Sequence, residues 1–324
     1  MKKSTKISLI VASGLVGVGI IIFTAAMFVC GWNFSKLSTT SYVDNTYEIN
    51  ETFDKIFIDT DMTDITFELS DNNTCSVICH EAENAKHSAS VQNGALTVKT
   101  VDERKWYEHI GINLDMPKMT VYLPNNKYTS LFVETDVGNV FIPSDFSFGE
   151  LEIKGDTAYV DCYSSVLGAM NIRTDAGDIK ITKASADNIT LSTSTGNVTL
   201  TSLEVKNDME IVTDTGIIGF SDVSCSKLGV TSDTGEVSFL SGCNAGTLSL
   251  ETDTGNILFE GFDAEEIVVK TDTGDVRGSF LTDKVFITKT DCGEVDVPES
   301  INGGMCKVTT DSGDIILSVI NSYE

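Results

Sequence analysis

A short motif of the form Thr-Asp-Thr-Gly-Asp recurs along the chain from residue 130 onward, and it constrains the fold more than any other feature. Each copy is flanked on both sides by alternating apolar and polar residues. This period of two is typical of half-buried β-strands. The copies are so short that none can bury its own apolar side, whereas stacked copies cover one another. The glycines of the nine clear copies are Gly138, Gly177, Gly196, Gly216, Gly235, Gly255, Gly274, Gly293 and Gly313.

A tenth, degenerate copy with Ala158 in the glycine position fills the gap between Gly138 and Gly177, so that all spacings are 19 or 20 residues. The positions seven and five before the glycine, and two and four after it, are apolar in every copy except for Thr288 and Gly278. The sequence therefore predicts an all-β fold, a parallel β-helix or β-solenoid of about ten coils of 19–20 residues. At ~4.8 Å per coil, such a rod is roughly 48 Å long.

The turn of each copy suggests its own chemistry. Glycine at the third position of a type II turn supplies the positive φ that this turn needs. The aspartate two residues before the glycine, replaced once by Ser194, can accept a backbone N–H and fix the bend. Calcium is the alternative, because a hard cation takes oxygen ligands and would offset repulsion between stacked carboxylates. The candidate calcium ligands are Asp214, Asp233, Asp253, Asp272, Asp291 and Asp311; no other cofactor is expected.

Residues 47–130 also have strand patterns, but without regular spacing. Residues 59–70 have the pattern of an early, degenerate coil, Asn93-Gly94 is a hairpin signal, and Pro124 ends a strand over residues 119–123. Since a solenoid needs a cover on its open end, we interpret residues 47–130 as an irregular β-rich N-terminal cap and residues 131–320 as the solenoid repeats.

Residues 7–32 contain no charged side chain and are long enough to cross a bilayer. Lys2, Lys3 and Lys6 precede this stretch, so the positive-inside rule places the N-terminus in the cytoplasm. We expect a cytoplasmic tail over residues 1–6, one transmembrane signal anchor over residues 7–32, a linker over residues 33–46 and an extracellular C-terminal domain. A cleaved signal peptide is the alternative, although its apolar region is usually shorter.

The net negative charge and the constant coil length argue against several classes of function. After Lys36 the chain carries 48 acidic against 18 basic side chains, which argues against a nucleic acid as partner and against peripheral binding to anionic lipid. The coils have constant length between residues 150 and 317, so they supply no long loops from which a catalytic cleft could be built. We therefore expect no enzymatic activity; a carbohydrate-active β-helix enzyme is the alternative from this class.

Residues 102–110 form the densest cluster of aromatic and basic side chains outside the apolar stretch. Within it, Trp106 and Tyr107 could stack on a sugar ring or pack against the cap.

The cysteines mostly point to structural roles. Cys162 and Cys306 fall in core columns. Cys225 and Cys243 are 18 residues apart, close to one coil, so a disulfide between adjacent coils is one alternative. A metal site of Cys75, Cys79 and His80 is disfavoured, because His80 alternates to the other face of their strand.

These features together resemble a known family. An N-terminal anchor, a strand ending in Tyr122-Leu123-Pro124 and repeated Leu-x-Val-x-Thr-x-x-Gly-x-Val units are similar to the bacterial DUF4097 family of candidate adhesins, over roughly residues 50–320. The resemblance implies a β-helix on the cell surface and transfers no catalytic residues. Some Gram-positive members lie among cell-envelope stress genes, which implies an envelope role by analogy.

We therefore expect a membrane-anchored, extracytoplasmic, non-enzymatic β-solenoid that acts as an adhesin or as a module binding a cell-wall or other envelope component. The alternative partner is a membrane protein, in which case the chain is an accessory of the envelope-stress response.

Overall fold

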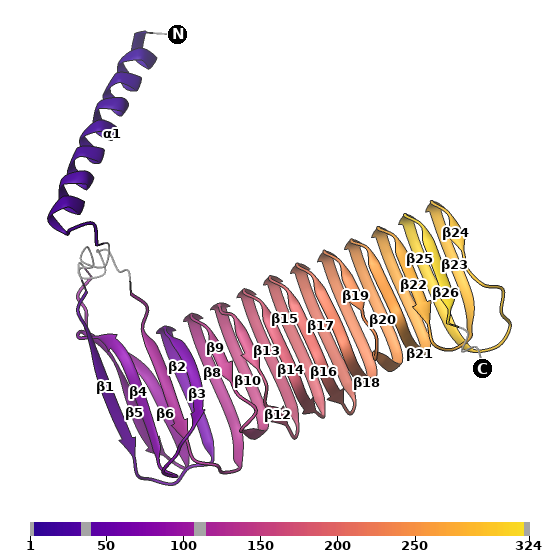
Figure 1. Ribbon diagram of the computed structural model, residues 1–324, viewed down its shortest axis with the longest axis horizontal. Helices are drawn as coiled ribbons and strands as arrows, with labels where there is room; N and C mark the ends of the chain where they lie inside the picture. The colour runs from indigo at the N-terminus through magenta and orange to yellow at the C-terminus, as the bar shows by residue number, and fades with distance from the viewer. Residues whose placement is uncertain (1–2, 34–39, 107–114, 321–324) are drawn as a thin grey trace.

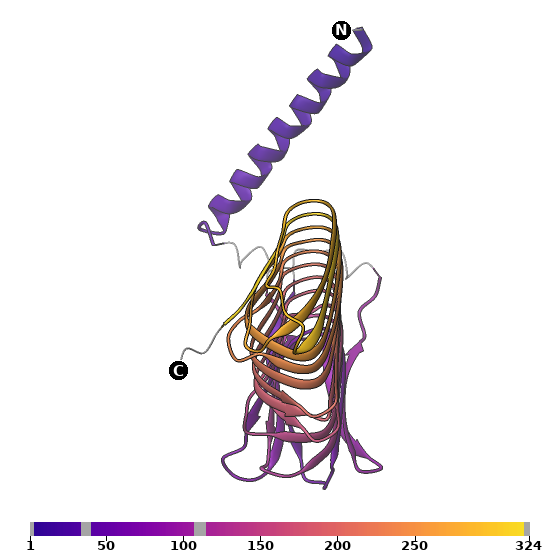
Figure 2. The same ribbon diagram turned by 90° about the vertical axis from the view of Figure 1, so that its right-hand side faces the viewer.

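The computed structural model describes residues 3–33, 40–106 and 115–320, and these residues form one helix and 26 β-strands. Helix α1 (Lys3–Val29) is apolar and mostly exposed, and its segment Thr5–Val29 is long and apolar enough to span a membrane. The strands wind into one long, flattened rod (Figures 1 and 2). The expected all-β solenoid preceded by a helix is confirmed.

Each coil consists of two sides joined by the glycine turn. In one coil β15 (Asn188–Thr195) leads into Gly196, and β16 (Val198–Val205) leads away from it. Neighbouring coils pair in parallel and in register, so Ile189 lies beside Met209 of the next coil. This register places residues of one repeat column above one another along the rod.

The strands on the side before the turn, called the first side, are β2 (Lys55–Met62), β8 (Tyr128–Val137), β10 (Ser147–Thr157), β13 (Ala169–Ala176), β15, β17 (Asp208–Thr215), β20 (Asn244–Thr254), β23 (Lys284–Cys292) and β25 (Gly304–Ser312). Those on the second side are β3 (Asp64–Leu69), β9 (Val140–Ile142), β11 (Val160–Cys162), β12 (Ser165–Val166), β14 (Ile179–Ala186), β16, β19 (Val237–Phe239), β22 (Val276–Phe280), β24 (Val295–Asp296) and β26 (Ile315–Val319). Two long strands run from the second side of one coil into the first side of the next, namely β18 (Ile218–Thr234) and β21 (Ile257–Thr273).

Antiparallel strands cover the end of the rod that follows α1. The coil of β2 and β3 stacks on that of β8 and β9, as expected for residues 59–70. Beyond it, β5 and β6 form a hairpin whose turn has positive φ at Asn93 (52°) and Gly94 (76°), which confirms the hairpin signal. The strands of this cap are β1 (Tyr42–Ile49), β4 (Cys75–Ala82), β5 (Ala85–Gln92), β6 (Ala95–Asp102) and β7 (Lys118–Leu123).

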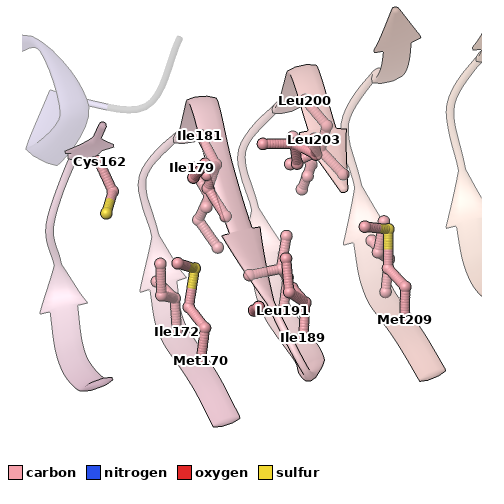
Figure 3. Close-up of a cluster of buried hydrophobic side chains, with 14 of the residues drawn as sticks. Cys162, Met170, Ile172, Ile179, Ile181, Ile189, Leu191, Leu200, Leu203 and Met209 are labelled. Atoms are coloured by element: carbon pink, nitrogen blue, oxygen red, sulfur yellow. The ribbon is translucent and has the colours of Figure 1, made fainter. Parts of the chain in front are cut away.

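The four predicted apolar columns form one continuous core along the rod. Side chains such as Ile172, Ile181 and Leu191 point between the two sides and are buried (Figure 3). One column carries a stack of phenylalanine rings, with 4.6 Å between the centroids of Phe220 and Phe239. Cys162 and Cys306 are buried members of this core, as their columns predict. Each buried side chain of this size contributes about 1.5–3 kcal/mol, so stacking supplies the stability that one coil lacks.

The last two coils do not stack in sequence order. On the first side, β21 pairs with β25 and β25 pairs with β23; on the second side, β22 pairs with β26 and β26 pairs with β24. The final coil therefore lies between residues 257–280 and residues 284–296. The coil of β23 and β24 forms the outer end of the rod, opposite β1 (Figure 1).

Candidate functional site

A shallow groove runs along the second side of the rod, and its cause is a bend that recurs in five successive coils. The bend lies six or seven residues after the turn position, where the backbone takes a positive φ between 54° and 87°. Such a conformation changes the direction of a strand and is uncommon for residues other than glycine. The residues at this bend are Lys183, Ser202, Asp222, Gly242 and Gly261.

Beyond the bend, two further residues of each coil face the core, with one outward residue between them. In β14 these inward residues are Ala184 and Ala186, and in β16 they are Leu203 and Val205. The outward residues lie beside one another from coil to coil, and all have hydrogen-bonding side chains. They are Ser185, Glu204, Ser224, Asn244 and Asp263, and we call them the groove column.

Three adjoining depressions of about 570, 490 and 460 Å³ lie along this column. Between Ser185 and Asp263 the column spans roughly 19 Å, at ~4.8 Å per coil. Basic side chains are mixed with the acidic ones: Lys206 lies 3.5 Å from Asp187, and the buried Lys284 donates to Asp263. A linear polymer with hydroxyl, amide and charged groups would meet a repeated set of matching groups here.

The aspartate column lies at the opposite bend of the coils, where its side chains point into solvent. All six candidate calcium ligands are exposed, and Asp291 lies 2.9 Å from Lys289. At the first copy, burial and then the neighbouring Asp156 raise the pKa of Asp136, as expected for like charges at coil spacing. Calcium binding by this column stays a prediction.

The turn hydrogen bonds are made by the residue after the glycine, three positions later in the chain than we expected. The N–H of Asn197 donates to Asp178 Oδ1 (2.7 Å), and the N–H of Ile217 donates to Asn197 Oδ1 (2.9 Å). The same ladder continues through Asn256, Asp275 and Asp314. The residue after the glycine therefore accepts hydrogen bonds between coils, a role that we had assigned to the aspartate before it.

The turns are also not type II. Where their φ is positive it lies near 150–158°, well beyond the value of about 80° at the third position of a type II turn. Their backbone N–H groups bond to the next coil, as in the 3.0 Å bond from Gly216 to Thr234 O. A Cβ at Gly216 or Gly235 would strike the carbonyl of the preceding turn. Glycine is thus required by close stacking at all nine turn positions, and by a positive φ at six of them.

A cluster of buried polar side chains in the cap was not foreseen from the sequence. Glu81 Oε1 accepts hydrogen bonds from Asn45 Nδ2 (2.6 Å) and Tyr47 Oη (2.8 Å). Its Oε2 accepts from the backbone N–H and the Nδ1 of His87, both at 2.6 Å. The other ring nitrogen of His87 lies 3.2 Å from Thr63 Oγ1. The only sequence signal is parity, since Glu81 shares its strand face with buried cysteines.

Cys79, Glu81 and His87 bring their ligand atoms within 4.8 Å of one another, which makes them the one such cluster of three metal-ligating groups in the described part of the chain. The carboxylate of Glu81 is nevertheless saturated by four donors, so the cluster is satisfied by the protein itself. Burial, followed by the charge of Glu81, raises the pKa of the Cys79 thiol. We interpret the cluster as a structural hydrogen-bond network that links β1, β4 and β5.

The remaining sequence candidates that the structure describes lie on the cap rather than in the groove. Trp106 is 78% exposed at the edge of the cap, and Tyr107 lies outside the described residues. The side chain of His80 lies on the outer face of β4, between Asp44 and Asp115. The side chain of Cys79 points to the opposite, buried face.

The disulfide alternative for Cys225 and Cys243 is wrong. Both thiols are free, because the register pairs Cys225 with Ala245 and places Asn244 beside Ser224.

Comparison with known proteins gives one family and several solved structures. The family described as Toastrack DUF4097 matches residues 53–240, more than half of the chain. A candidate adhesin of Bacteroides fragilis is 12% identical, with a TM-score of 0.43 over 87% of this chain and 99% of that one. A candidate lipid-binding protein of Parabacteroides distasonis is 15% identical, with a TM-score of 0.44 over 85% of this chain and 96% of that one. No curated protein matches the chain.

Proposed function

The chain belongs to the Toastrack DUF4097 family, and from this premise we propose that it is a membrane-anchored surface protein whose groove binds an extended polymer of the cell envelope. The observation that carries the proposal is the groove column, in which five hydrogen-bonding side chains follow one another in register. A site that repeats once per coil suits a ligand that repeats along its own length. The proposed role is binding rather than catalysis.

The chemistry of the groove favours a cell-wall glycan over an apolar ligand. Its column offers the hydroxyls of Ser185 and Ser224 and the amide of Asn244, and the carboxylate of Glu204 lies between the two serines. Hydroxyls and amides can both donate and accept hydrogen bonds, as the hydroxyl and acetamido groups of a glycan require. The depressions are open and shallow, so a chain can lie across them without entering an enclosed pocket.

The position of the helix supports an exterior location for this groove. Helix α1 is apolar enough to anchor the chain, and the three lysines before residue 7 favour retention of its N-terminal side in the cytoplasm. The cap begins at β1 (Tyr42–Ile49), whose start lies within residues 33–46 that we expected to be a linker, so the rod would extend away from the membrane.

The test is retention of the full chain, held in lipid nanodiscs, on purified cell-wall sacculi. We expect saturable retention that Glu204→Ala combined with Asn244→Ala reduces at least about tenfold, because two of the five coils of the groove column lose their polar contacts to the polymer. The matched control combines Glu210→Ala with Ser249→Ala, which changes exposed outer residues of β17 and β20 on the first side. Equal loss in both variants, or no retention at all, would contradict the groove as the binding site.

A chelator arm of the same experiment addresses calcium. Retention that falls on chelation, and falls equally when Asp233→Asn and Asp253→Asn are combined, would assign a metal role to the aspartate column. Retention unchanged by chelator would indicate that the groove column binds the polymer without calcium.

A further inference from the structure

The outer end of the rod exposes a strand edge. Among the strands of the described residues, β23 pairs only with β25, and β24 pairs only with β26. We call this end, formed by residues 284–296, the distal end. At the other end of the rod, the antiparallel cap strands cover the first coil.

The core is uncovered at the distal end. Val295 is 43% exposed, whereas Ile315 of the same column, one coil inward, is fully buried. Phe286 and Val297 are only partly buried, and Ile287 is 51% exposed. A nine-residue strand edge beside apolar side chains is a template for pairing with another strand.

The backbone of β23 fixes which groups are available at this edge. The N–H of Gly313 donates to Cys292 O (2.9 Å), so the carbonyl of Cys292 points inward to the neighbouring coil. The register of β23 with β25 skips Asp291, so the regular alternation of backbone groups is interrupted at this corner. The N–H of Lys227, eight residues before its turn glycine, bonds to the preceding coil, and by alternation from the equivalent position the backbone groups of Thr288 and Thr290 point to the free edge. The side chains of Lys289 and Asp291 are exposed and carry opposite charges.

We propose that the distal end binds the distal end of a second copy of this chain, through antiparallel pairing of β23 with β23. A twofold axis beside Thr290 places each Lys289 opposite Asp291 of the second copy. The two copies of Thr290 then exchange both backbone hydrogen bonds, and the side chains of Lys289 and Asp291 form ion pairs on the outer face. The strand is thus complementary to itself in hydrogen bonding and in charge, as a twofold interface requires.

The geometry also determines what such a pair would connect. The anchor helix precedes β1 at the capped end, and β23 lies at the other end (Figure 1). Two copies joined at their distal ends therefore carry their anchors at opposite ends of a double-length rod. This second step rests on the proposed surface location, and it makes the pair a bridge between two facing membranes.

The first test measures the oligomeric state of the full chain in detergent by sedimentation velocity. We expect a concentration-dependent dimer. Lys289→Asp alone and Asp291→Lys alone should each weaken it about tenfold or more, because two cross-strand pairs become repulsive. Combining both substitutions in one chain, or mixing the two single variants, should restore the dimer. A chain that stays monomeric, or a dimer indifferent to these charges, would overturn the proposal.

A disulfide tests the register independently of charge. Pairing about Thr290 places Thr288 opposite Cys292 of the second copy, and the Cα atoms of directly opposed residues lie about 4.5–5.5 Å apart, within the range of a disulfide. The variant Thr288→Cys should therefore form a covalent dimer on mild oxidation, and Cys292→Ser in the same chain should abolish it. Within one chain these positions are about 13 Å apart along the strand, too far for a bond. Absence of the crosslink in a folded variant would refute this register.

The bridging step is tested with vesicles of neutral phosphatidylcholine that carry the full chain and no cell-wall material. We expect the vesicles to cluster, and Lys289→Asp to prevent clustering. A dimer in detergent without vesicle clustering would overturn the bridge but not the pairing. Since no glycan is present, neither result depends on the groove.

Discussion

The Nδ1 atom of His87 lies 2.6 Å from Oε2 of Glu81, and both side chains are buried where β4 and β5 close the end of the rod. The same carboxylate receives Tyr47 and Asn45 from β1. One buried carboxylate therefore connects three strands of the cap. Its contribution to stability depends on keeping all four of its hydrogen-bond donors.

We expect Glu81→Gln to lower the free energy of unfolding by about 1–3 kcal/mol, because the amide cannot accept all four hydrogen bonds and leaves a buried donor unpaired. Chemical denaturation of the full chain in detergent, followed by circular dichroism, would measure this. The control is Glu83→Gln, at an exposed position two residues later, which should change stability by less than about 0.5 kcal/mol. An equal effect at both positions would contradict the role of Glu81.

The same residue predicts a pH dependence. Burial raises the pKa of Glu81, but hydrogen bonds from Asn45, His87 and Tyr47 outweigh it and hold the pKa below its ordinary value of 4.5. Its stabilising effect is therefore fully present above the pKa of the unfolded chain and is lost as pH falls through the lower folded pKa. The stability difference between the wild-type chain and Glu81→Gln should shrink between about pH 5 and pH 3. A difference that stays constant over this range would show that ionisation is not involved.

The inter-coil ladder predicts unequal effects for two neighbouring columns. Asn197→Ala removes the acceptor of the Ile217 N–H and should cost about 1 kcal/mol. Asp214→Ala removes an exposed carboxylate from a column of like charges, so stability should be unchanged or slightly higher at low salt. Thermal unfolding of the two variants side by side would decide this. A larger loss for Asp214→Ala would return the turn role to the aspartate column.

Close stacking of the turns predicts that Gly216→Ala is far more harmful than Gly219→Ala. At Gly216 a Cβ meets the carbonyl of Gly196, while at Gly219 its nearest neighbour is Ser238 Oγ at 3.8 Å. We expect a loss of at least about 2 kcal/mol for Gly216→Ala, and little change or a small gain for Gly219→Ala. The unfolding midpoints of both variants provide the measurement, and similar midpoints would contradict close stacking.

The columns around the glycine were enough to predict the core, because strand alternation and in-register stacking both follow from a repeat of constant length. The groove lies beyond these columns, the last of which is four residues after the glycine. The bend at Lys183, Ser202 and Asp222 has no common residue type, although the apolar residues beyond it recur. The Glu81 cluster is assembled from three strands without a motif, so only the fold brings it together.

The stacking order of the last coils could not be predicted, since one repeat fits beside another equally well. One exception did mark the outer coil: Thr288 occupies a column that is otherwise apolar. At the distal end this position is partly exposed, so a polar residue is tolerated there. The exception that looked like an irregularity of the repeat therefore identifies the coil that is covered on one face only.

The inverted order of the last coils also affects how the tip of the rod resists fraying. Both segments that leave the outermost coil lead back inward, one from β22 and one to β25. The tip is therefore a closed loop tethered at both ends, and its strands cannot peel away one residue at a time. Detaching it requires the whole coil to leave at once, which makes the most exposed part of the rod a cooperative unit.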